Sequence, residues 1–363
     1  FTKKMIRPYI YNKKMVSTLR ENRIQKGIYQ FNNMLYVSYN LKIPSIYKLL
    51  ELLVSLEDKP YKFYAGLLSK FTYAKIEYPL NKKIFPILKQ LLMKQNSYCF
   101  LKLFYDAGIL HKLFANFRKV LHLPQFDGYH HFPVDIHSIK CVEALENIKE
   151  PFIKNIYNEF DSDYKLLVKI VTLFHDTGKG RKQDHSEVGA KLIVPFLRQI
   201  NLKEELRQRA VTLVKHHILM SSVAFKENIH NEKTLYKFMS KIEDAKNLYL
   251  LYVITYADVN GVGGETFNSF NSKLLYDLYR SSLEIAQNSE RITDAKKRLI
   301  IENRVKKHPD FALLSRLEQK KILSVESNLF FFKNSTQAIL DISKAARNIK
   351  DYDFKIPNQD SLT

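Results

Sequence analysis

Residues 173–190 read LFHDTGKGRKQDHSEVGA, and this stretch decides which kind of fold the sequence indicates. An apolar run leads into the pair His175 and Asp176, and Gly178 and Gly180 follow at once, as they do where a helix ends. A carboxylate is almost never fully buried without a partner, and an imidazole is only an intermediate former of protein cores. The stretch therefore predicts that these two side chains meet polar groups from elsewhere in the chain.

The rest of the chain predicts a mostly or wholly helical protein. Apolar residues recur at helical spacing in nearly every segment, and the 363 residues include only 10 glycines. Residues 44–122 are expected to form several amphipathic helices that serve packing alone, one of them written YCFLKLFYDAGILHKLFANFRKVLHL at 98–123. Pro124, Gly128 and Pro133 interrupt the pattern, so a loop and a domain boundary are expected there.

The charge of the chain is strongly positive but does not point to one partner. There are 58 Lys and Arg against 37 Asp and Glu, which gives a formal net charge of +21. The basic residues are scattered as short pairs, and a basic surface without a recognition motif is only an electrostatic footprint. We therefore do not expect nucleic acid as the partner.

The cysteines and the apolar runs indicate the cellular compartment in which the protein is expected. The two cysteines, Cys99 and Cys141, lie in apolar helical contexts without C-x-x-C spacing, so neither a disulfide framework nor a zinc ribbon is indicated. No apolar run is long enough to span a bilayer, and the first residues, FTKKMIRPYI, do not form a signal peptide. We expect a cytoplasmic protein without a membrane partner, and a segment of a longer chain.

Helical phase separates inward from outward polar residues. On the helix after Lys203, His217 shares the apolar face with Ala210 and Leu213, whereas His216 lies off that face. The same test turns His175 and Asp258 inward. Further along the chain, Asp184 is predicted to cap a helix, which puts His185 in its first turn.

These inward groups together favour a metal site. Taken alone, each histidine could be a core residue with its hydrogen bonds satisfied, and each aspartate could be a helix cap. Burying a carboxylate without a partner, however, would cost free energy. Imidazole and carboxylate without thiolate suit Mg, Mn, Fe, Co or Zn. Two such ions about 3.5 to 4 Å apart are a common device for hydrolysing phosphate esters, and one ion lowers the pKa of a bound water.

The order His137, His175, Asp176, His185, His217, Asp258 resembles the HD superfamily of metal-dependent phosphohydrolases. A closer similarity lies in QFDGYHHFPVDIHS, LFHDTGKGRKQDHSEVGA, VKHHILMSSVA and TYADVNGVGGETFNSFNSKLLYDLY. These segments resemble stretches of the bifunctional uridylyltransferase/uridylyl-removing enzyme (GlnD) family. The similarity is strongest from Gln125 to Tyr279. Phe267, Phe270 and Phe132-Pro133 depart from the family pattern at positions that we take to serve packing.

The resemblance implies an all-α HD domain and assigns roles to its residues. It implies that one divalent ion is held by His137, His175, Asp176 and Asp258. Mg or Mn is expected in preference to Fe, Co or Zn. It implies that His185 and His217 hold a second ion, with Asp176 bridging. Lys179 is expected to stabilise the charge of a phosphate group; its simpler explanation is that an exposed lysine adds solubility. Asp127 and His130 are expected either to orient the metal ligands or to form hydrogen bonds within their own loop.

The resemblance also implies a division of the chain. Residues 1–124 are expected to be a helical region, 125–261 the HD phosphohydrolase domain and 262–363 a helical extension. No segment resembles the family's nucleotidyltransferase or ACT domains, so we expect no nucleotidyl transfer from this chain.

The implied reaction is hydrolysis of the bond that joins UMP to a tyrosine of uridylylated PII signalling protein, with UMP as product. Two alternatives stay open. One is another HD phosphodiesterase that acts on a nucleotide or on an RNA end, which the net charge of +21 would suit. The other is a helical scaffold that docks PII without cleaving it, and such a scaffold would need no metal.

Overall fold

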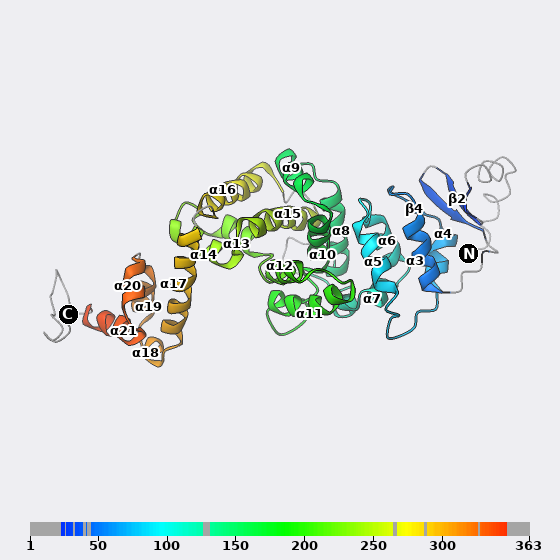
Figure 1. Ribbon diagram of the computed structural model, residues 1–363. Coiled ribbons are helices and arrows are strands. Elements are labelled where there is room, and N and C mark those ends of the chain that lie inside the picture. Colours follow the sequence, from blue (N-terminus) through cyan, green and yellow to red (C-terminus); the bar gives the residue numbers. More distant parts are fainter. Residues whose placement is uncertain are drawn as a thin grey trace. The chain divides into compact units, whose positions relative to one another are not determined.

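A computed structural model describes residues 23–25, 27–31, 33–38, 41, 45–125, 131–263, 267–286, 289–325 and 327–346. Helices dominate the described residues, as the sequence predicted (Figure 1). The chain divides into two compact units. The first unit holds residues 1–225 and 246–275, and the second holds 226–245 and 276–363. The bounds of these units differ from the predicted domain boundaries at 124/125 and 261/262. The predicted domain division stays a prediction.

A small sheet near the start of the first unit was not expected. Its strands, in spatial order, are β1 (Arg23–Gln25), β2 (Ile28–Phe31), β3 (Met34–Val37) and β4 (Lys62–Phe63). The first three are antiparallel, and β4 joins β3 in parallel. Gly27 and Asn33, with φ of 81° and 58°, make the two tight turns. Strands of two to four residues are too short to show a period of two, so the sequence pattern missed them.

The helices that follow are shorter than the sequence predicted. They are α3 (Ile46–Ser55), α4 (Ala65–Thr72), α5 (Ile84–Met93), α6 (Tyr98–Asp106), α7 (Leu110–Leu113) and the 3₁₀ helix η1 (Ala115–Lys119). The single helix expected over 98–123 is therefore wrong. Gly108 has a φ of 69°, which a right-handed helix does not accept, and it ends the first piece.

The centre of the first unit is a group of helices that pack on one another. They are α8 (Val134–Glu146), α9 (Pro151–Glu159), α10 (Ser162–Phe174), α11 (His185–Gln199), α12 (Glu204–Lys215), α13 (Leu219–Lys226) and α15 (Ala245–Gly261). In α10 every residue from Leu166 to Phe174 is buried, and this helix packs on α5, α8 and α12 (Figure 1). Because α10 is covered on all sides, its end at His175 lies inside the protein.

A buried ion pair joins α8 to α10 and also bonds to the start of α6. The Nζ of Lys169 on α10 lies 2.7 Å from Oε1 of Glu146 on α8 and donates to the carbonyl oxygen of Lys94 at 2.6 Å. The same carboxylate accepts from the backbone N–H of Ser97 at 2.8 Å and of Tyr98 at 3.1 Å, where α6 begins. Since both charges are almost wholly buried, removing either partner would leave an unpaired charge inside the protein.

The second unit is built from α14 (Glu232–Ile242), the end of α16 (Ser269–Ala286), α17 (Ser289–Lys307), α18 (Pro309–Ala312), α19 (Arg316–Ser324), α20 (Asn328–Lys333) and α21 (Thr336–Ala345). Phe331, Ile339 and Leu340 are central to its own apolar core. In the described part of the chain, no helix has the length and apolar character to cross a lipid bilayer.

Candidate metal centre

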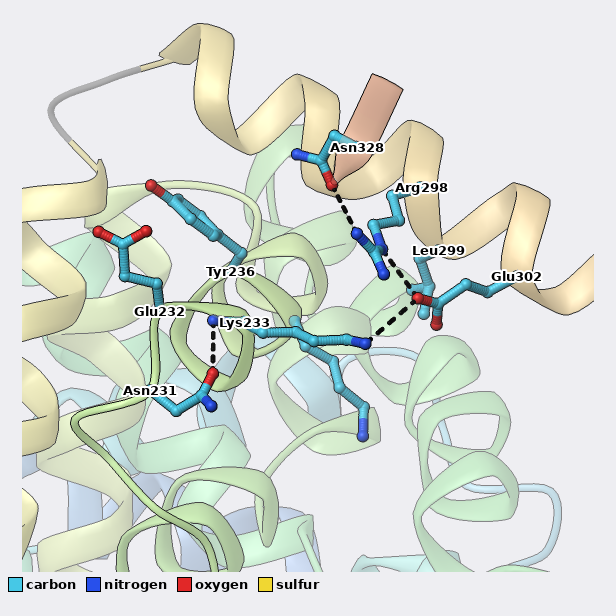
Figure 2. A pocket seen from close by; sticks show the side chains of 9 residues that line it. Asn231, Glu232, Lys233, Tyr236, Arg298, Leu299, Glu302 and Asn328 are labelled. Atoms are coloured by element: carbon cyan, nitrogen blue, oxygen red, sulfur yellow. Dashed lines mark hydrogen bonds and ion pairs between the residues drawn. The ribbon is translucent and has the colours of Figure 1, made fainter. Parts of the chain in front are cut away.

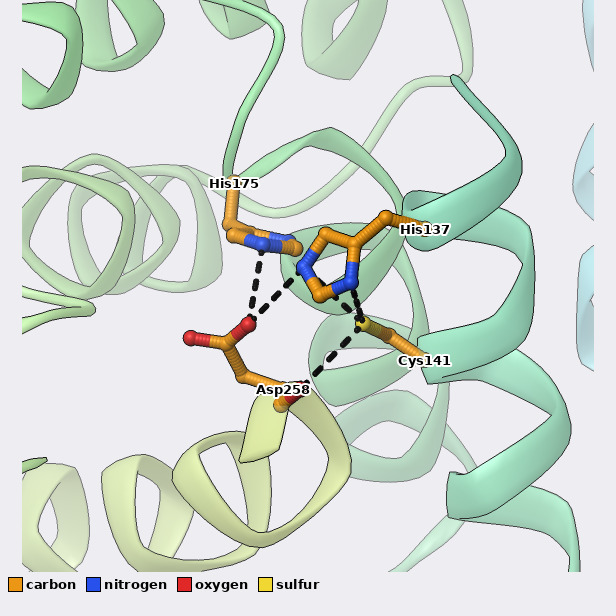
Figure 3. Close-up of side chains that lie close together, drawn as sticks. All are labelled: His137, Cys141, His175 and Asp258. Atoms are coloured by element: carbon orange, nitrogen blue, oxygen red, sulfur yellow. Dashed lines mark hydrogen bonds and ion pairs between the residues drawn. The ribbon is translucent and has the colours of Figure 1, made fainter. Parts of the chain in front are cut away.

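Polar side chains from five segments of the first unit converge at one place. His137 comes from α8, Asp258 from α15, His185 from the start of α11, and His217 follows α12. His175 and Asp176 come from the end of α10, and Figure 3 shows His137, His175 and Asp258 turned toward one another. All six residues predicted as metal ligands from the sequence are therefore brought together; their binding of an ion stays a prediction.

The local sequence aims two of these imidazoles into the cluster. The Nδ1 of His175 donates to the carbonyl oxygen of Thr172 at 2.7 Å, and the Nδ1 of His217 donates to that of Val214 at 2.8 Å. Each bond fixes the ring and turns Nε2 inward. His217 is 1% exposed, as its predicted phase required, but it lies in a turn after α12 and not inside a longer helix.

His185 is placed by a helix cap. The side chain of Asp184 accepts from the backbone N–H groups of Ser186 and Glu187 and so starts α11 at His185, which confirms the predicted cap. The turn after Asp176 packs closely on this start, since a Cβ at Gly178 would lie 1.9 Å from the carbonyl oxygen of His185. A glycine at 178 is therefore required for His185 to face the cluster.

A second close approach brings Asp258 to His137. A Cβ at Gly261 would lie 2.3 Å from Sγ and 2.8 Å from the backbone nitrogen of Cys141, so α15 can approach α8 this closely only with glycine there. Asp258 lies one turn earlier on α15, and His137 one turn earlier on α8. The contact at Gly261 therefore sets the distance between these two residues.

The distances form two overlapping groups around Asp176. Oδ1 of Asp258 lies 3.0 Å from Nε2 of His137 and 3.4 Å from Nε2 of His175. Oδ2 of Asp176 lies 3.4 Å from His175 and 3.7 Å from His137, while its Oδ1 lies 3.5 Å from His217 and 3.8 Å from His185. The Asp176 carboxylate therefore faces both groups of histidines, one with each oxygen.

The buried nitrogen atoms fit a divalent ion. The Nε2 atoms of His175, His185 and His217 are buried, and among the described residues none has a partner with hydrogen-bond geometry. Buried polar atoms without a partner are rare in native proteins. Ligands held about 2 Å from one ion lie about 3 to 3.5 Å apart, which is close to the spacing seen here. Imidazole and carboxylate donors within 4.8 Å of one another thus match a site for borderline divalent metals.

The imidazoles and carboxylates of the cluster shift one another's pKa. Burial opposes a charge on His175, but Asp176 and Asp258 outweigh it and raise the pKa of this imidazole to about 10. Burial likewise opposes ionisation of the two carboxylates, yet the neighbouring histidines hold the pKa of both well below the usual range. Two buried carboxylates that stay ionised need positive charge beside them, and a divalent ion would supply it.

Lys179 lies at the edge of the cluster. Its Nζ is 2.7 Å from Oδ2 of Asp176 and also donates to the side-chain oxygen of Gln125. The amide nitrogen of Gln125 donates to the carbonyl oxygen of Phe132 at 3.2 Å, so the oxygen of this amide is turned toward the lysine. Gln125 was not among the predicted site residues, because nothing local in a loop marks a contact 54 positions away. Asp127 and His130 lie outside the described residues.

Cys141 was also missed, and the sequence did contain a signal for it. It stands four positions after His137, so both share one face of α8. Its Sγ lies 3.5 Å from Nε2 and 3.6 Å from Nδ1 of His137, which places the sulfur beside the ring and off the line of the Nε2 lone pair (Figure 3). Burial raises the pKa of the thiol well above its usual value. Cys141 therefore lies against His137, and its sulfur belongs to the group formed with His137, His175 and Asp258, so the expectation of a plain apolar context was wrong.

A cavity elsewhere holds none of these groups. It measures about 390 Å³ and lies in the second unit between α14 and α17 (Figure 2). There the guanidinium of Arg298 bonds to Glu302 at 2.9 Å and to Asn328 at 3.0 Å. Its most buried charge is thus already paired, and the cavity adds nothing to the metal centre.

Comparison with known proteins agrees with this geometry. Residues 134–245 match the HD domain family, a range that contains five of the six clustered residues and stops before Asp258. Bifunctional uridylyltransferase/uridylyl-removing enzymes are similar to the chain. That of Cereibacter sphaeroides is 31% identical over 226 residues, which are 58% of this chain and 24% of the relative. That of Chromobacterium violaceum is 34% identical over 185 residues, 49% of this chain and 21% of the relative.

The chain thus spans about a quarter of the length of the curated relatives it matches. HD domains bind divalent metals, and five of the six clustered residues lie within the domain match, with Asp258 beyond its end. The chain therefore carries an HD domain, within a segment that is similar to part of the bifunctional uridylyltransferase/uridylyl-removing enzymes.

Proposed function

We propose that this chain hydrolyses the phosphodiester that joins UMP to a tyrosine hydroxyl of the PII signalling protein and so releases UMP. The HD domain and its relatives support a metal-dependent hydrolase. The observation that carries the proposal is the convergence of the unpartnered Nε2 atoms of His175, His185 and His217 around Asp176. The choice of substrate rests on what the relatives are named for.

In this proposal the two groups of distances correspond to two ions, Mg or Mn. His137, His175 and Asp258 would hold the first ion, and His185 and His217 would hold the second. Asp176 contributes one oxygen to each group. Divalent ions in such a site lower the pKa of water and polarise the oxygens of a phosphoryl group.

The protein's own residues orient the substrate and balance its charge. The Lys179 ammonium lies beside Asp176 and at the rim of the cluster, where it can pair with a phosphate oxygen and stabilise the charge that develops during attack on phosphorus. Gln125 holds this ammonium in place. The leaving group is the tyrosine phenolate, whose conjugate acid has a pKa of about 10, so its departure needs little help from an acid.

A second candidate is a different HD phosphodiesterase, acting on a nucleotide or on an RNA end. The net charge of +21 favours this candidate, since nucleic-acid substrates are polyanions. A catalytically silent scaffold fits less well, because a scaffold has no need of buried histidine nitrogens without partners.

The deciding experiment is mass spectrometry of uridylylated PII after incubation with the purified chain and Mn. We expect the mass of one UMP to be lost from PII and free UMP to appear in solution. The matched pair of variants is His217→Ala, which should be inactive, and His216→Asn, which should be active. If PII keeps its UMP while the chain cleaves a model phosphodiester, the substrate assignment is wrong and the hydrolase assignment stands.

A further inference from the structure

A second cavity, of about 220 Å³, lies in the first unit between the end of α5 and helices α8, α9 and α10. It contains none of the clustered histidines and aspartates. The charged residues that line it are four lysines and one carboxylate: Lys94, Lys154, Lys165, Lys169 and Glu146. Formal charges therefore leave an excess of positive charge around a partly open space.

The contacts show which of these charges are balanced. Lys169 is 3% exposed and pairs with Glu146 at 2.7 Å, so these two cancel. The Nζ of Lys94 donates to the carbonyl oxygen of Leu56 at 2.7 Å, and the Nζ of Lys165 donates to that of Asn158 at 3.2 Å. Neutral oxygens satisfy hydrogen bonds but do not balance a charge. Among the described residues, Lys94, Lys154 and Lys165 have no carboxylate within ion-pair distance.

One carboxylate outside the cavity, Asp58, bears on this excess of positive charge without removing it. Asp58 interacts electrostatically with Lys94 and offsets part of its charge, but Asp58 does not line the cavity beside Lys154 and Lys165. The cavity of the second unit behaves differently, because there Glu302 pairs with Arg298 at 2.9 Å and faces Lys233 at 3.9 Å. In the cavity of the first unit, by contrast, the one lining carboxylate, Glu146, is paired with Lys169, and Lys94, Lys154 and Lys165 face the same space.

The cavity also offers neutral donors suited to an anion. Tyr157 lines it, and burial raises the pKa of its phenol, so the hydroxyl stays protonated and can donate. The side chains of Asn158 and Gln95 lie at the same cavity and carry amide donors. Ammonium and hydroxyl donors around a small space are the usual surroundings of phosphate and carboxylate groups.

We propose that this cavity binds a compact anion of two or more negative charges through Lys94, Lys154 and Lys165. The inference does not rest on the proposed function. Glu146 stands nine residues after His137 on α8, and Lys169 stands six residues before His175 on α10. At 1.5 Å per residue these offsets are about 13 and 9 Å, so the anion site is separate from the metal centre but shares its two helices. Occupancy stabilises the native arrangement of α8, α9 and α10.

Calorimetric titration of the full chain with inorganic pyrophosphate tests this inference. The protein is first stripped of metal and then freed of the chelator, so that the metal centre cannot bind the probe through an ion. We expect one saturable site per chain, with affinity that falls as salt is added. Lys154→Gln and Lys165→Gln should each weaken binding about tenfold, which is the loss of one charge-assisted hydrogen bond. Lys154 is exposed, so its variant should fold normally.

The matched control is Lys191→Gln, which removes the same charge from an exposed position on α11 away from the cavity. It should change the affinity by less than about twofold. Equal losses in the control and the cavity variants would mean general attraction to a basic surface and would overturn the inference. Citrate in place of pyrophosphate distinguishes a carboxylate ligand from a phosphate ligand. Saturable binding of neither anion at millimolar concentration would also overturn it.

Discussion

The ammonium of Lys179 lies 2.7 Å from Oδ2 of Asp176, the oxygen that also lies 3.4 Å from His175. One carboxylate oxygen thus faces both a lysine and a histidine of the metal centre. If the lysine serves phosphate charge and is not a ligand, its removal should spare the metal and damage the reaction. The two properties can therefore be separated in a single variant.

Lys179→Met should lower kcat by about a hundredfold, the usual size of one electrostatic contact to a developing charge. Metal content, measured by elemental analysis after gel filtration, should stay close to that of the unaltered chain. Lys179→Arg keeps the charge and should recover part of the rate. A variant that loses metal and rate together would show that Lys179 holds the site together and has no separate role toward phosphate.

Substituting a predicted metal ligand, in contrast to Lys179, should lower the metal content of the protein. His175→Ala or Asp176→Ala should lose most of the bound divalent ion, because each contributes to the group of atoms around Asp176. Chelation should lower the melting temperature of the unaltered chain and leave that of the variants unchanged, since a ligand stabilises only the protein that binds it. Full metal content in both variants would remove the central claim.

The adjacent histidines 216 and 217 provide an internal control. His217 is 1% exposed, and its Nε2 lies 3.5 Å from Oδ1 of Asp176. His216 is only half-buried and lies at the start of the turn, at the C-cap of α12. His217→Ala should abolish hydrolysis, whereas His216→Asn should leave most of it, as measured by UMP release. The reverse ranking would contradict the placement of the two rings.

Gly261→Ala should destabilise the chain by about 1 to 3 kcal/mol, because the added methyl would collide with Cys141. The same displacement would move Asp258 away from His137, so metal content should fall as well. Cys141→Ala removes the sulfur but not the backbone nitrogen 2.8 Å away, and in the double variant it should restore only part of the stability. Denaturant unfolding of the four proteins in this cycle measures the coupling. Strict additivity would show that the two sites do not touch.

Asp58, which lies outside the metal centre, should make the free energy of unfolding depend on pH. Burial opposes its ionisation, but hydrogen bonds from the backbone of Gln95 and Asn96 prevail and lower the pKa. A lowered pKa in the folded state adds stability above the unfolded value of about 3.9, and that stability is lost as the pH falls through the folded pKa. Asp58→Asn should therefore cost about 1 kcal/mol at neutral pH.

The difference between Asp58→Asn and the unaltered chain should shrink as the pH drops below about 4. Urea unfolding at several pH values measures it, and Glu77→Gln, at an exposed carboxylate, serves as the control with little change. A difference that stays constant with pH would mean that the charge of Asp58 does not matter.

The sequence predicted the features that depend on neighbours along the chain. The cap at Asp184 and the inward phase of His217 follow from local rules, because a helix repeats its faces every few residues. The convergence of helices on Asp176 could be expected only from the family resemblance, since spacing along the chain says nothing about which helices meet.

What the sequence did not predict depends on contacts between distant segments or on short elements. Gln125 reaches Lys179 across 54 positions, and no periodic pattern marks such a contact. The strands β1 to β4 are shorter than the window that a pattern needs. Gly108 breaks the predicted helix at 98–123 through its backbone conformation, while the apolar spacing around it continues unchanged.

The ion pair between Lys169 and Glu146 limits how far the chain can be truncated from its N-terminal side and still fold. Glu146 caps the start of α6, and Lys169 holds the carbonyl of Lys94, so the first 124 residues supply partners to charges buried under the HD helices. A fragment that began at residue 125 would leave these charges without those partners and would expose the apolar faces of α8 and α10. The helices α5 and α6 are thus part of the same cooperative folding unit as the metal centre. Amide exchange should therefore protect α6 and α10 to a similar degree.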